Sequence, residues 1–303
     1  MACYHPLFAW RAPPHLVHRS GKRKAIVFND PCDDRFDRVI IPCGQCIGCR
    51  LERSRQWAIR CVHEASLHES NCFLTLTYND ENLPSNGSLN LEDIQLFLKR
   101  LRRHVEPVKI RFFQCGEYGE QYQRPHHHCI IFGYDFPDKE LIGRNLGNSV
   151  YQSATLDRLW GKGFCSIGDV SFESAAYVAR YVLKKVTGKE ADSHYGDRKP
   201  DFITMSRRPG LAADWFNKFE GDVYPKDFLT IRNGLKCHPP KFYDRLYERN
   251  HGSNELAKIV EKRKEKASLL PEPYSPDLQD RYKRLIDQEA YRETVTKLLK
   301  RKI

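Results

Sequence analysis

Three consecutive histidines, His126, His127 and His128, are the residues of this chain whose types and spacing best fit chemistry. They open an apolar run between Pro125 and Gly133, which is typical of a buried β-strand. Alternate side chains of a strand share a face, so His126 and His128 point one way and His127 points the other. Two imidazoles on one face can hold a divalent cation through neutral ring nitrogens.

A hard cation such as Mg²⁺ or Mn²⁺ would also need an oxygen ligand. Glu117, expected in the turn of a hairpin before the histidine strand, is the first candidate, and Glu120 is the second. With 12 histidines in 303 residues, chance alone gives roughly 0.5 His-x-His pairs. On this motif alone, two hydrogen-bonded strand histidines therefore remain an alternative.

A second candidate for chemistry is the pair Tyr177 and Tyr181, in a helix expected over residues 172–187. Residues four apart lie on one face of a helix, and Lys184 follows on the same side. A tyrosine phenol can attack a phosphodiester when a metal polarises the phosphate or a cation stabilises the phenolate. The pattern indicates a phosphotransfer site.

Two other tyrosine pairs have the same spacing. Tyr118 and Tyr122 fall in a glycine-containing turn, where helical spacing has no meaning. Tyr243 and Tyr247 follow Pro240 in what can be a short helix, so this pair remains a rival.

Cys43, Cys46 and Cys49 form a compact cluster, Cys-x2-Cys-x2-Cys. Three thiolates so close can bind zinc if a fourth ligand arrives from elsewhere. Reduced cysteines packed at a helix start are an equally weighted alternative. The candidate fourth ligands are Cys3, His5, Cys32 and Cys61.

The charge balance points to a polyanionic partner. The net charge is +11 and the pI is about 9.1, and a basic protein of this size most often binds nucleic acid. We see no secretory leader and no apolar run near the ~18–20 residues of a membrane span. Eleven cysteines without a leader favour a reducing cytoplasm over a disulfide framework.

The elements that must position these residues read as strands and helices in alternation. Strands are expected at residues 71–78, 109–115 and 164–170, besides the histidine strand. Helices are expected over 91–104 after a cap at Asn90, 153–160, 172–187 after a cap at Ser171, and 211–219. Antiparallel strands with helices on one face predict an α+β fold.

The remaining segments decorate this core. Residues 1–47 look irregular apart from a short strand near 39–42, and 188–200 reads as a loop. The tail from about residue 254 is charged and reads as surface helix or a partly disordered segment. We expect an N-terminal segment (1–70), a core (71–190) and a C-terminal region with a basic helical tail (191–303).

In this order, the strand 73–78, the His-x-His strand and the Tyr-x3-Tyr-x2-Lys helix resemble the motifs of rolling-circle replication initiators, the HUH endonucleases. Residues 42–50, 116–119, 124–128, 177–185 and 205–210 resemble the gokushovirus branch of the microviruses. The resemblance covers roughly residues 1–220. One departure is His127, which stands where the family has an apolar residue; it leaves open which two histidines bind the metal.

The resemblance implies an RRM- or ferredoxin-like core and a metal-dependent nickase of replicative-form DNA. One tyrosine becomes linked to the 5′ phosphate, the free 3′ hydroxyl primes synthesis, and the second tyrosine later allows the circle to be rejoined without ATP. Mg²⁺ or Mn²⁺ would be the cofactor. Arg124, Arg180 and Lys185 would contact DNA.

The implied partners are single-stranded and supercoiled origin DNA and the host helicase and DNA polymerase, in the host bacterial cytoplasm. A competing interpretation is a non-catalytic, basic, zinc-containing nucleic-acid-binding protein, which needs only the charge and the cysteine cluster. A third is a single-tyrosine relaxase or transposase of the same superfamily. Mutating each tyrosine alone separates that enzyme from the two-tyrosine scheme.

Overall fold

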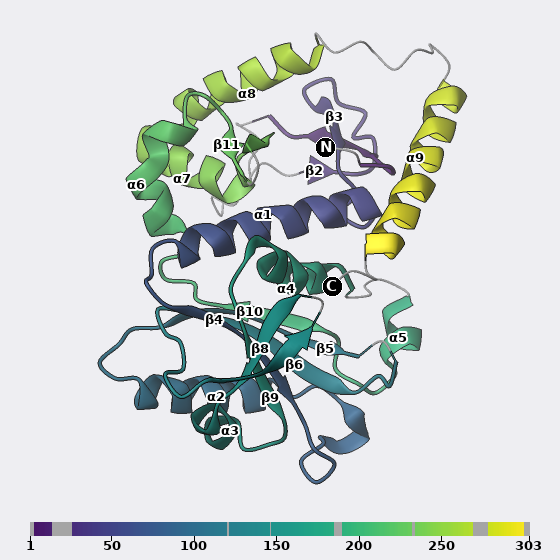
Figure 1. Cartoon of the computed structure of the whole chain (residues 1–303). Helices are drawn as coiled ribbons and strands as arrows, with labels where there is room; N and C mark the ends of the chain where they lie inside the picture. The colour runs from purple at the N-terminus through teal and green to yellow at the C-terminus, as the bar shows by residue number, and fades with distance from the viewer. Residues whose placement is uncertain are drawn as a thin grey trace. The chain divides into compact units, whose positions relative to one another are not determined.

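The computed structural model describes residues 3–13, 26–119, 121–145, 147–184, 190–231, 234–268 and 278–299 (Figure 1). For residues 180–184 the description covers the helical backbone and not the side chains. The chain forms two compact units, residues 1–52 with 271–303 and residues 53–270. The three-part division expected from the sequence stays a prediction. The longer helices are α1 (Ile47–Ala65), α2 (Leu91–His104), α3 (Ala154–Trp160), α4 (Phe172–Lys184), α5 (Glu190–Tyr195), α6 (Ala213–Val223), α7 (Lys241–His251), α8 (Ser253–Ser268) and α9 (Leu278–Leu299).

The larger unit is built on a seven-stranded sheet in the order β10-β5-β6-β4-β9-β8-β7, and its strand pairs are antiparallel. The histidine strand β6 lies between β5 and β4, so both of its edges are hydrogen-bonded. A strand in that position is held rigidly. The strands are β4 (Asn71–Thr77), β5 (Arg111–Tyr118), β6 (Pro125–Phe132), β7 (Glu140–Asn145), β8 (Asn148–Gln152), β9 (Cys165–Gly168) and β10 (Phe202–Met205).

Helices cover both faces of this sheet. On one face, Leu74 and Ile131 pack with Phe97 of α2 and Trp160 of α3. On the other face, which carries His126 and His128, the core is formed by residues of α1, α4, β5 and β6: Cys61, Val178, Phe113, Ile130 and Phe132. The predicted α+β class with an antiparallel sheet is confirmed. The helices were expected on one face only, and that detail is wrong because each sheet face carries its own apolar row.

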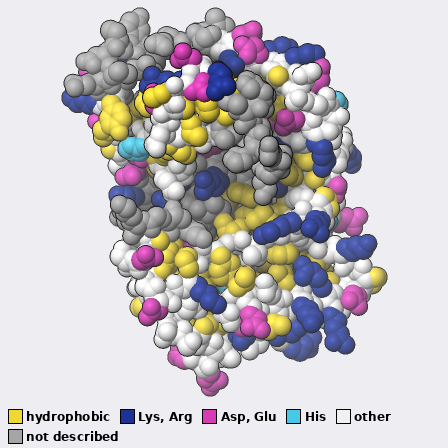
Figure 2. All heavy atoms as spheres, turned by 180° about the vertical axis from the view of Figure 1, so that it is seen from behind, with side chains coloured by type: hydrophobic (Ala, Val, Ile, Leu, Met, Phe, Trp, Pro, Cys, Tyr) yellow, Lys and Arg dark blue, Asp and Glu magenta, His cyan; other side chains and the backbone are white. Residues whose placement is uncertain are grey.

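Helix α2 follows the sequence expectation closely. The Asn90 side chain caps it by accepting a hydrogen bond from the backbone N–H of Glu92 at 3.1 Å. The basic stretch at Lys99–Arg103 is exposed, apart from buried Leu101. Figure 2 shows Lys and Arg side chains gathered toward the lower right, where α2 lies. This helix thus presents a solvated basic face.

The smaller unit contains more structure than its sequence suggested. A three-stranded antiparallel sheet in the order β2-β1-β3 occupies part of the segment expected to be irregular. The expected short strand near 39–42 is confirmed as part of β3. The charged C-terminal tail is helical, as α9 shows. The strands are β1 (Leu7–Arg11), β2 (Ile26–Val27) and β3 (Asp37–Ile41).

Three further segments depart from expectation. Gly116, Glu117 and Tyr118 were expected in a turn and belong to β5, because their backbones pair with β6. Part of the segment 188–200, expected to be a loop, forms helix α5. The hairpin β7–β8 and the edge strand β10 were not foreseen, because both are short and lack a clean alternation of apolar and polar residues.

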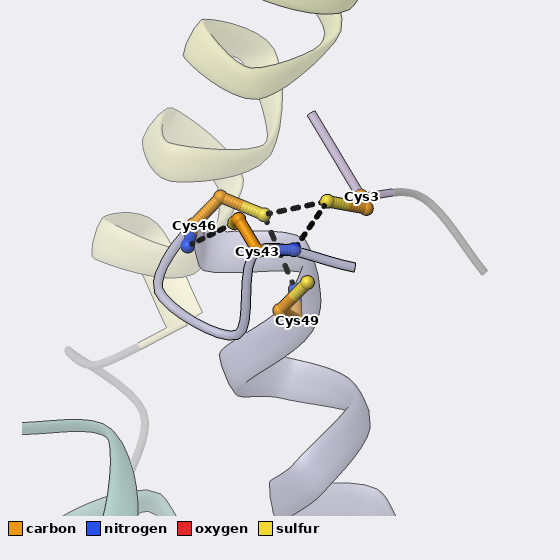
Figure 3. A group of neighbouring side chains, drawn as sticks. All are labelled: Cys3, Cys43, Cys46 and Cys49. Carbon is orange, nitrogen blue, oxygen red and sulfur yellow. Dashed lines mark hydrogen bonds between the residues drawn. The ribbon is translucent and has the colours of Figure 1, made fainter. Parts of the chain in front are cut away.

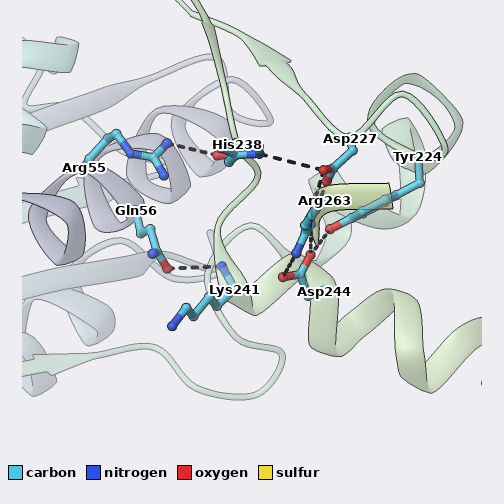
Figure 4. Close-up of polar contacts among 8 residues, drawn as sticks. All are labelled: Arg55, Gln56, Tyr224, Asp227, His238, Lys241, Asp244 and Arg263. Carbon is cyan, nitrogen blue, oxygen red and sulfur yellow. Dashed lines mark hydrogen bonds and ion pairs between the residues drawn. The ribbon is translucent and has the colours of Figure 1, made fainter. Parts of the chain in front are cut away.

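The helices after the sheet are held together by Arg263 of α8. Its guanidinium donates to both carboxylates of Asp227 and Asp244, at 2.6–2.9 Å, and Tyr224 donates its hydroxyl to Asp244 (Figure 4). The Arg263 side chain is 26% exposed, and the two aspartates are 10% and 16% exposed. Hydrogen bonds to Asp227 and Asp244 raise the pKa of Arg263 above its ordinary range. Beside this cluster lie the short strands β11 (Leu229–Thr230) and β12 (Lys236–Cys237).

We expect Arg263→Ala to lower the unfolding temperature of the chain. The change leaves two largely buried carboxylates facing each other without their cation, which costs about 3 kcal/mol, or roughly 6–12 °C in a unit of this size. Lys264→Ala is the matched control, because its ion pair with Glu261 is exposed and contributes about 0–1 kcal/mol. Differential scanning calorimetry measures both, and equal unfolding temperatures for the two variants would contradict the assignment.

Candidate active site

Glu117, His126 and His128 come together on one face of the sheet. In the register of β5 and β6, Glu117 is opposite His126, and directly opposite residues of antiparallel strands point to the same side. The Nε2 atoms of His126 and His128 lie 2.7 and 3.1 Å from the same oxygen, Oε1 of Glu117. The ligand atoms of the three residues are all within 4.8 Å of one another. Glu117 is therefore placed by strand pairing and not by a turn.

The far nitrogens of both imidazoles are held by protein groups. Nδ1 of His126 lies 3.1 Å from the carbonyl oxygen of Arg124, and Nδ1 of His128 lies 3.0 Å from the hydroxyl of Thr75. Both Nδ1 and Nε2 of His126 thus face oxygen acceptors. A neutral imidazole carries only one N–H, so a cation between Nε2 and the Glu117 carboxylate completes this arrangement.

The donor set is one that binds divalent cations. Two imidazole nitrogens and one carboxylate oxygen suit Mn²⁺ and related ions, and Mg²⁺ when water or substrate phosphate supplies further oxygens. Burial opposes ionisation of Glu117, but hydrogen bonds from His126 and His128 outweigh it and lower the pKa of Glu117. The carboxylate is therefore ionised, as a metal ligand must be. The residues fit a metal held by Glu117, His126 and His128.

The third histidine of the run is used on the opposite face. His127 is fully buried, with Nε2 3.0 Å from the Tyr78 hydroxyl and Nδ1 3.2 Å from the Gln114 amide. Tyr78 in turn donates to Asp93, and Gln114 accepts from Thr204. Burial lowers the pKa of His127 to about 3, helped by the charges of the neighbouring histidines. The open question of which two histidines share a face is answered: they are His126 and His128.

Helix α4 places Tyr177 beside this cluster. Ser171 and Ser174 cap the helix reciprocally, each backbone N–H donating to the other's hydroxyl at 2.8 and 3.1 Å. Val178 is buried in the core under the helix. The Tyr177 ring meets the His128 ring edge-on, with centroids 5.2 Å apart and an interplanar angle of 80°. A tyrosine on the capped helix is thus in contact with one of the candidate metal ligands.

Comparison with known proteins points in one direction. The family model for the replication-associated protein ORF2 matches residues 71–186. "Replication-associated protein VP4" of Bdellovibrio phage phiMH2K is 34% identical over 284 residues, 89% of this chain and 85% of the relative. "Replication-associated protein ORF2" of Spiroplasma virus 4 is 33% identical over 88% of this chain and 87% of the relative. The chain belongs to the phage replication-associated proteins.

Other comparisons add to this assignment. "Replication-associated protein ORF4" of Chlamydia phage 1 is 34% identical over 68% of this chain and 53% of the relative. No solved structure matches the chain. Among the described residues of this phage replication-associated protein, no helix is both long and apolar enough to cross a membrane.

The structure also places the other residues singled out from the sequence. The Arg124 guanidinium donates to the Tyr78 carbonyl at 3.0 Å and to the Asp80 carboxylate at 2.7 Å, so its contacts within the protein orient the chain just before β6. Its role in binding DNA stays a prediction. The side chains of Arg180, Tyr181 and Lys184, and residues Glu120 and Lys185 entirely, lie outside the described part of the chain.

The rival tyrosine pair lies in a different environment. Tyr243, on α7, is fully buried in the core formed with α6, and its hydroxyl lies 2.7 Å from Nδ1 of His63. Burial raises the pKa of Tyr243 well above its ordinary range. Tyr247 stacks between Tyr224 and His251. Tyr243 is therefore a core residue, which leaves Tyr177 as the better candidate nucleophile of a phage replication-associated protein.

The cysteine cluster gains a fourth member. Cys3 joins Cys43, Cys46 and Cys49, with all four sulfurs within 4.8 Å of one another. The other candidate fourth ligands are used elsewhere: His5 contacts Glu289, Cys32 is exposed, and Cys61 is buried in the core under the sheet.

Thr75 is a site residue that sequence reasoning missed. It lies on β4 directly opposite His128, and its hydroxyl holds the Nδ1 atom of that imidazole. The sequence contained one usable signal, a threonine within an apolar strand next to the histidine strand. The strand register that pairs the two residues is set by tertiary structure, so the contact was not predictable.

We expect Thr75→Val to weaken binding of Mn²⁺ by about 10–100-fold, the usual cost of losing the group that orients a metal-binding imidazole. Valine keeps the shape of the side chain and removes only the hydroxyl. Thr77→Val is the matched control, because the Thr77 hydroxyl donates to the carbonyl of Phe164 and not to a histidine. Mn²⁺ titration followed by electron paramagnetic resonance measures both affinities. Equal losses in the two variants would contradict the role of Thr75.

Proposed function

We propose that the protein is a replication initiator that nicks origin DNA through a tyrosine nucleophile and so starts rolling-circle replication. The observation that carries this proposal is the contact between the Tyr177 ring and His128, at the edge of the Glu117, His126 and His128 cluster. Membership among phage replication-associated proteins agrees with it.

In the proposed reaction, the Tyr177 phenol oxygen attacks a backbone phosphorus of single-stranded origin DNA. A phosphorus–oxygen bond to tyrosine forms and the bond from phosphorus to O3′ breaks. The phenol proton passes to water, and the departing O3′ takes a proton from water. A cation bound by Glu117, His126 and His128 supplies charge stabilisation at the phosphate oxygens.

The phosphotyrosine bond preserves the energy of the broken phosphodiester. Tyr181, four residues further along α4, is proposed to attack the regenerated origin after one round of synthesis. The released 3′ hydroxyl then closes the circle without ATP. Arg124, Arg180 and Lys185 are proposed DNA contacts and Lys184 the cation near the phenolate. A host helicase and polymerase in the bacterial cytoplasm complete the scheme.

A covalent-adduct assay tests this proposal. Single-stranded oligonucleotides tiling the genome that encodes the chain, labelled at the 3′ end, are incubated with protein and Mn²⁺ and run on a denaturing protein gel. We expect one oligonucleotide to transfer its label to the protein, and EDTA to prevent the transfer. If the protein binds DNA but no oligonucleotide gives an adduct, the nickase proposal fails and a non-catalytic nucleic-acid-binding protein is the better account.

A further inference from the structure

We propose that Cys3, Cys43, Cys46 and Cys49 bind one structural zinc ion, and that this centre joins the N-terminal sheet to the C-terminal helix α9. The four cysteines come from two places far apart in the sequence (Figure 3). The centre belongs to the smaller unit of the chain and does not depend on the proposed nuclease activity.

The spacing of the sulfurs fits a tetrahedral ion. Zinc–sulfur bonds of about 2.3 Å at tetrahedral angles place sulfurs about 3.8 Å apart. The Sγ atoms of Cys3 and Cys46 are 4.0 Å apart, and all four sulfurs lie within 4.8 Å. A disulfide needs about 2.05 Å between sulfurs, and all four cysteines are free thiols.

Backbone amides surround the sulfurs as they would surround thiolates. Five backbone N–H groups donate to the sulfurs at 3.2–3.5 Å, and three of them point to Cys43 and Cys46 from within the 43–49 segment. Cys46 also directly precedes α1, where the positive end of the helix dipole favours negative charge. Gly44 has φ +76°, a left-handed conformation that lets the chain turn tightly between Cys43 and Cys46.

Zinc binding balances simply. Four thiols release their protons to the buffer, four Zn–S bonds form, and no electron is transferred. The positions of the ligands then give the ion a structural role. It closes the chain between residue 3 and residues 43–49, a segment that contains β1, β2 and β3.

The C-terminal helix is attached to the same centre. Leu285 of α9 packs against the cluster of Tyr4, Cys46 and Cys49, and His5, two residues after Cys3, contacts Glu289 of α9. The cysteine cluster, the start of the chain and α9 thus meet in one small core. Because so little other apolar surface is buried there, we infer that the ion is what keeps α9 in place.

Metal analysis of the full chain tests the site. Protein purified with a reductant and passed through EDTA is expected to retain about one zinc per chain by mass spectrometry, while Cys46→Ser/Cys49→Ser retains none. Cys32→Ser, an exposed cysteine outside the cluster, is the matched control and should keep its zinc. Co²⁺ in place of zinc should give the sulfur-to-metal charge-transfer bands of a tetrathiolate. Wild-type protein that holds no metal, or iron instead of zinc, would overturn the proposal.

Hydrogen exchange tests the structural role. Loss of zinc is expected to speed amide exchange in α9 and in β1 and β3, while exchange in the seven-stranded sheet stays unchanged. The sheet thus reports, in the same sample, that the larger unit is folded. If α9 exchanges equally with and without zinc, the ion does not hold this helix. Should the double variant fail to fold, stripping zinc from the wild-type chain with a thiol-reactive mercurial provides the same comparison.

Discussion

Tyr177→Phe/Tyr181→Phe is expected to form no covalent adduct with origin DNA, a loss of at least ~10³-fold. Each phenylalanine removes the hydroxyl that would attack phosphorus and keeps the ring, so the edge-on contact with His128 is preserved. The affinity for Mn²⁺ should therefore stay at the wild-type value. The adduct is measured with 3′-labelled origin oligonucleotide on a denaturing gel.

The single variants carry the two-tyrosine part of the prediction. Tyr177→Phe and Tyr181→Phe should each retain some cleavage, because either phenol can attack the scissile phosphate. Tyr122→Phe is the matched control, since Tyr122 is 80% exposed and outside α4. Complete loss in one single variant with no loss in the other would indicate a single-tyrosine enzyme. An undiminished adduct in the double variant would remove both tyrosines from the mechanism.

Glu117→Gln is expected to reduce cleavage by about 10³-fold, since a metal ion at a reacting phosphate contributes several kcal/mol to the transition state. Glutamine has the size of glutamate, so the strand pairing with β6 should persist. It lacks the negative charge that both histidines face, so Mn²⁺ affinity should fall together with activity. The ionised carboxylate is the form present in the protein, because the hydrogen bonds from His126 and His128 lower its pKa.

Glu140→Gln is the control for this variant, because Glu140 is an exposed residue of β7. Cleavage is measured over a Mn²⁺ titration, and the far-ultraviolet circular dichroism of each variant checks its fold. High Mn²⁺ is expected to restore part of the activity of Glu117→Gln. If Glu117→Gln binds Mn²⁺ as tightly as wild type, the carboxylate is not a ligand.

Much of the candidate site was predictable because it depends on local rules. Strand alternation alone put His126 and His128 on one face and His127 on the other, and this is what the structure has. Helix spacing and the Ser171 cap likewise located the helix of Tyr177. Neither inference required knowledge of which elements are neighbours in space.

The parts that were not predicted depend on tertiary contacts. Gly116 looked like a turn residue, yet it pairs with His127 inside the sheet, and a Cβ there would lie 2.9 Å from the Phe202 ring. It is glycine because two rings crowd its face, which the sequence near it does not reveal. The choice of Cys3 among four candidate ligands depends in the same way on a sheet that brings residue 3 back to residue 43.

The most direct test of the central claim is mass spectrometry of the covalent adduct after digestion with trypsin and nuclease. The account predicts a nucleotide attached through its 5′ phosphate to Tyr177 or Tyr181, formed only when a divalent cation is present. A nucleotide on Tyr243 or Tyr247, on any residue outside α4, or on no residue at all would contradict it.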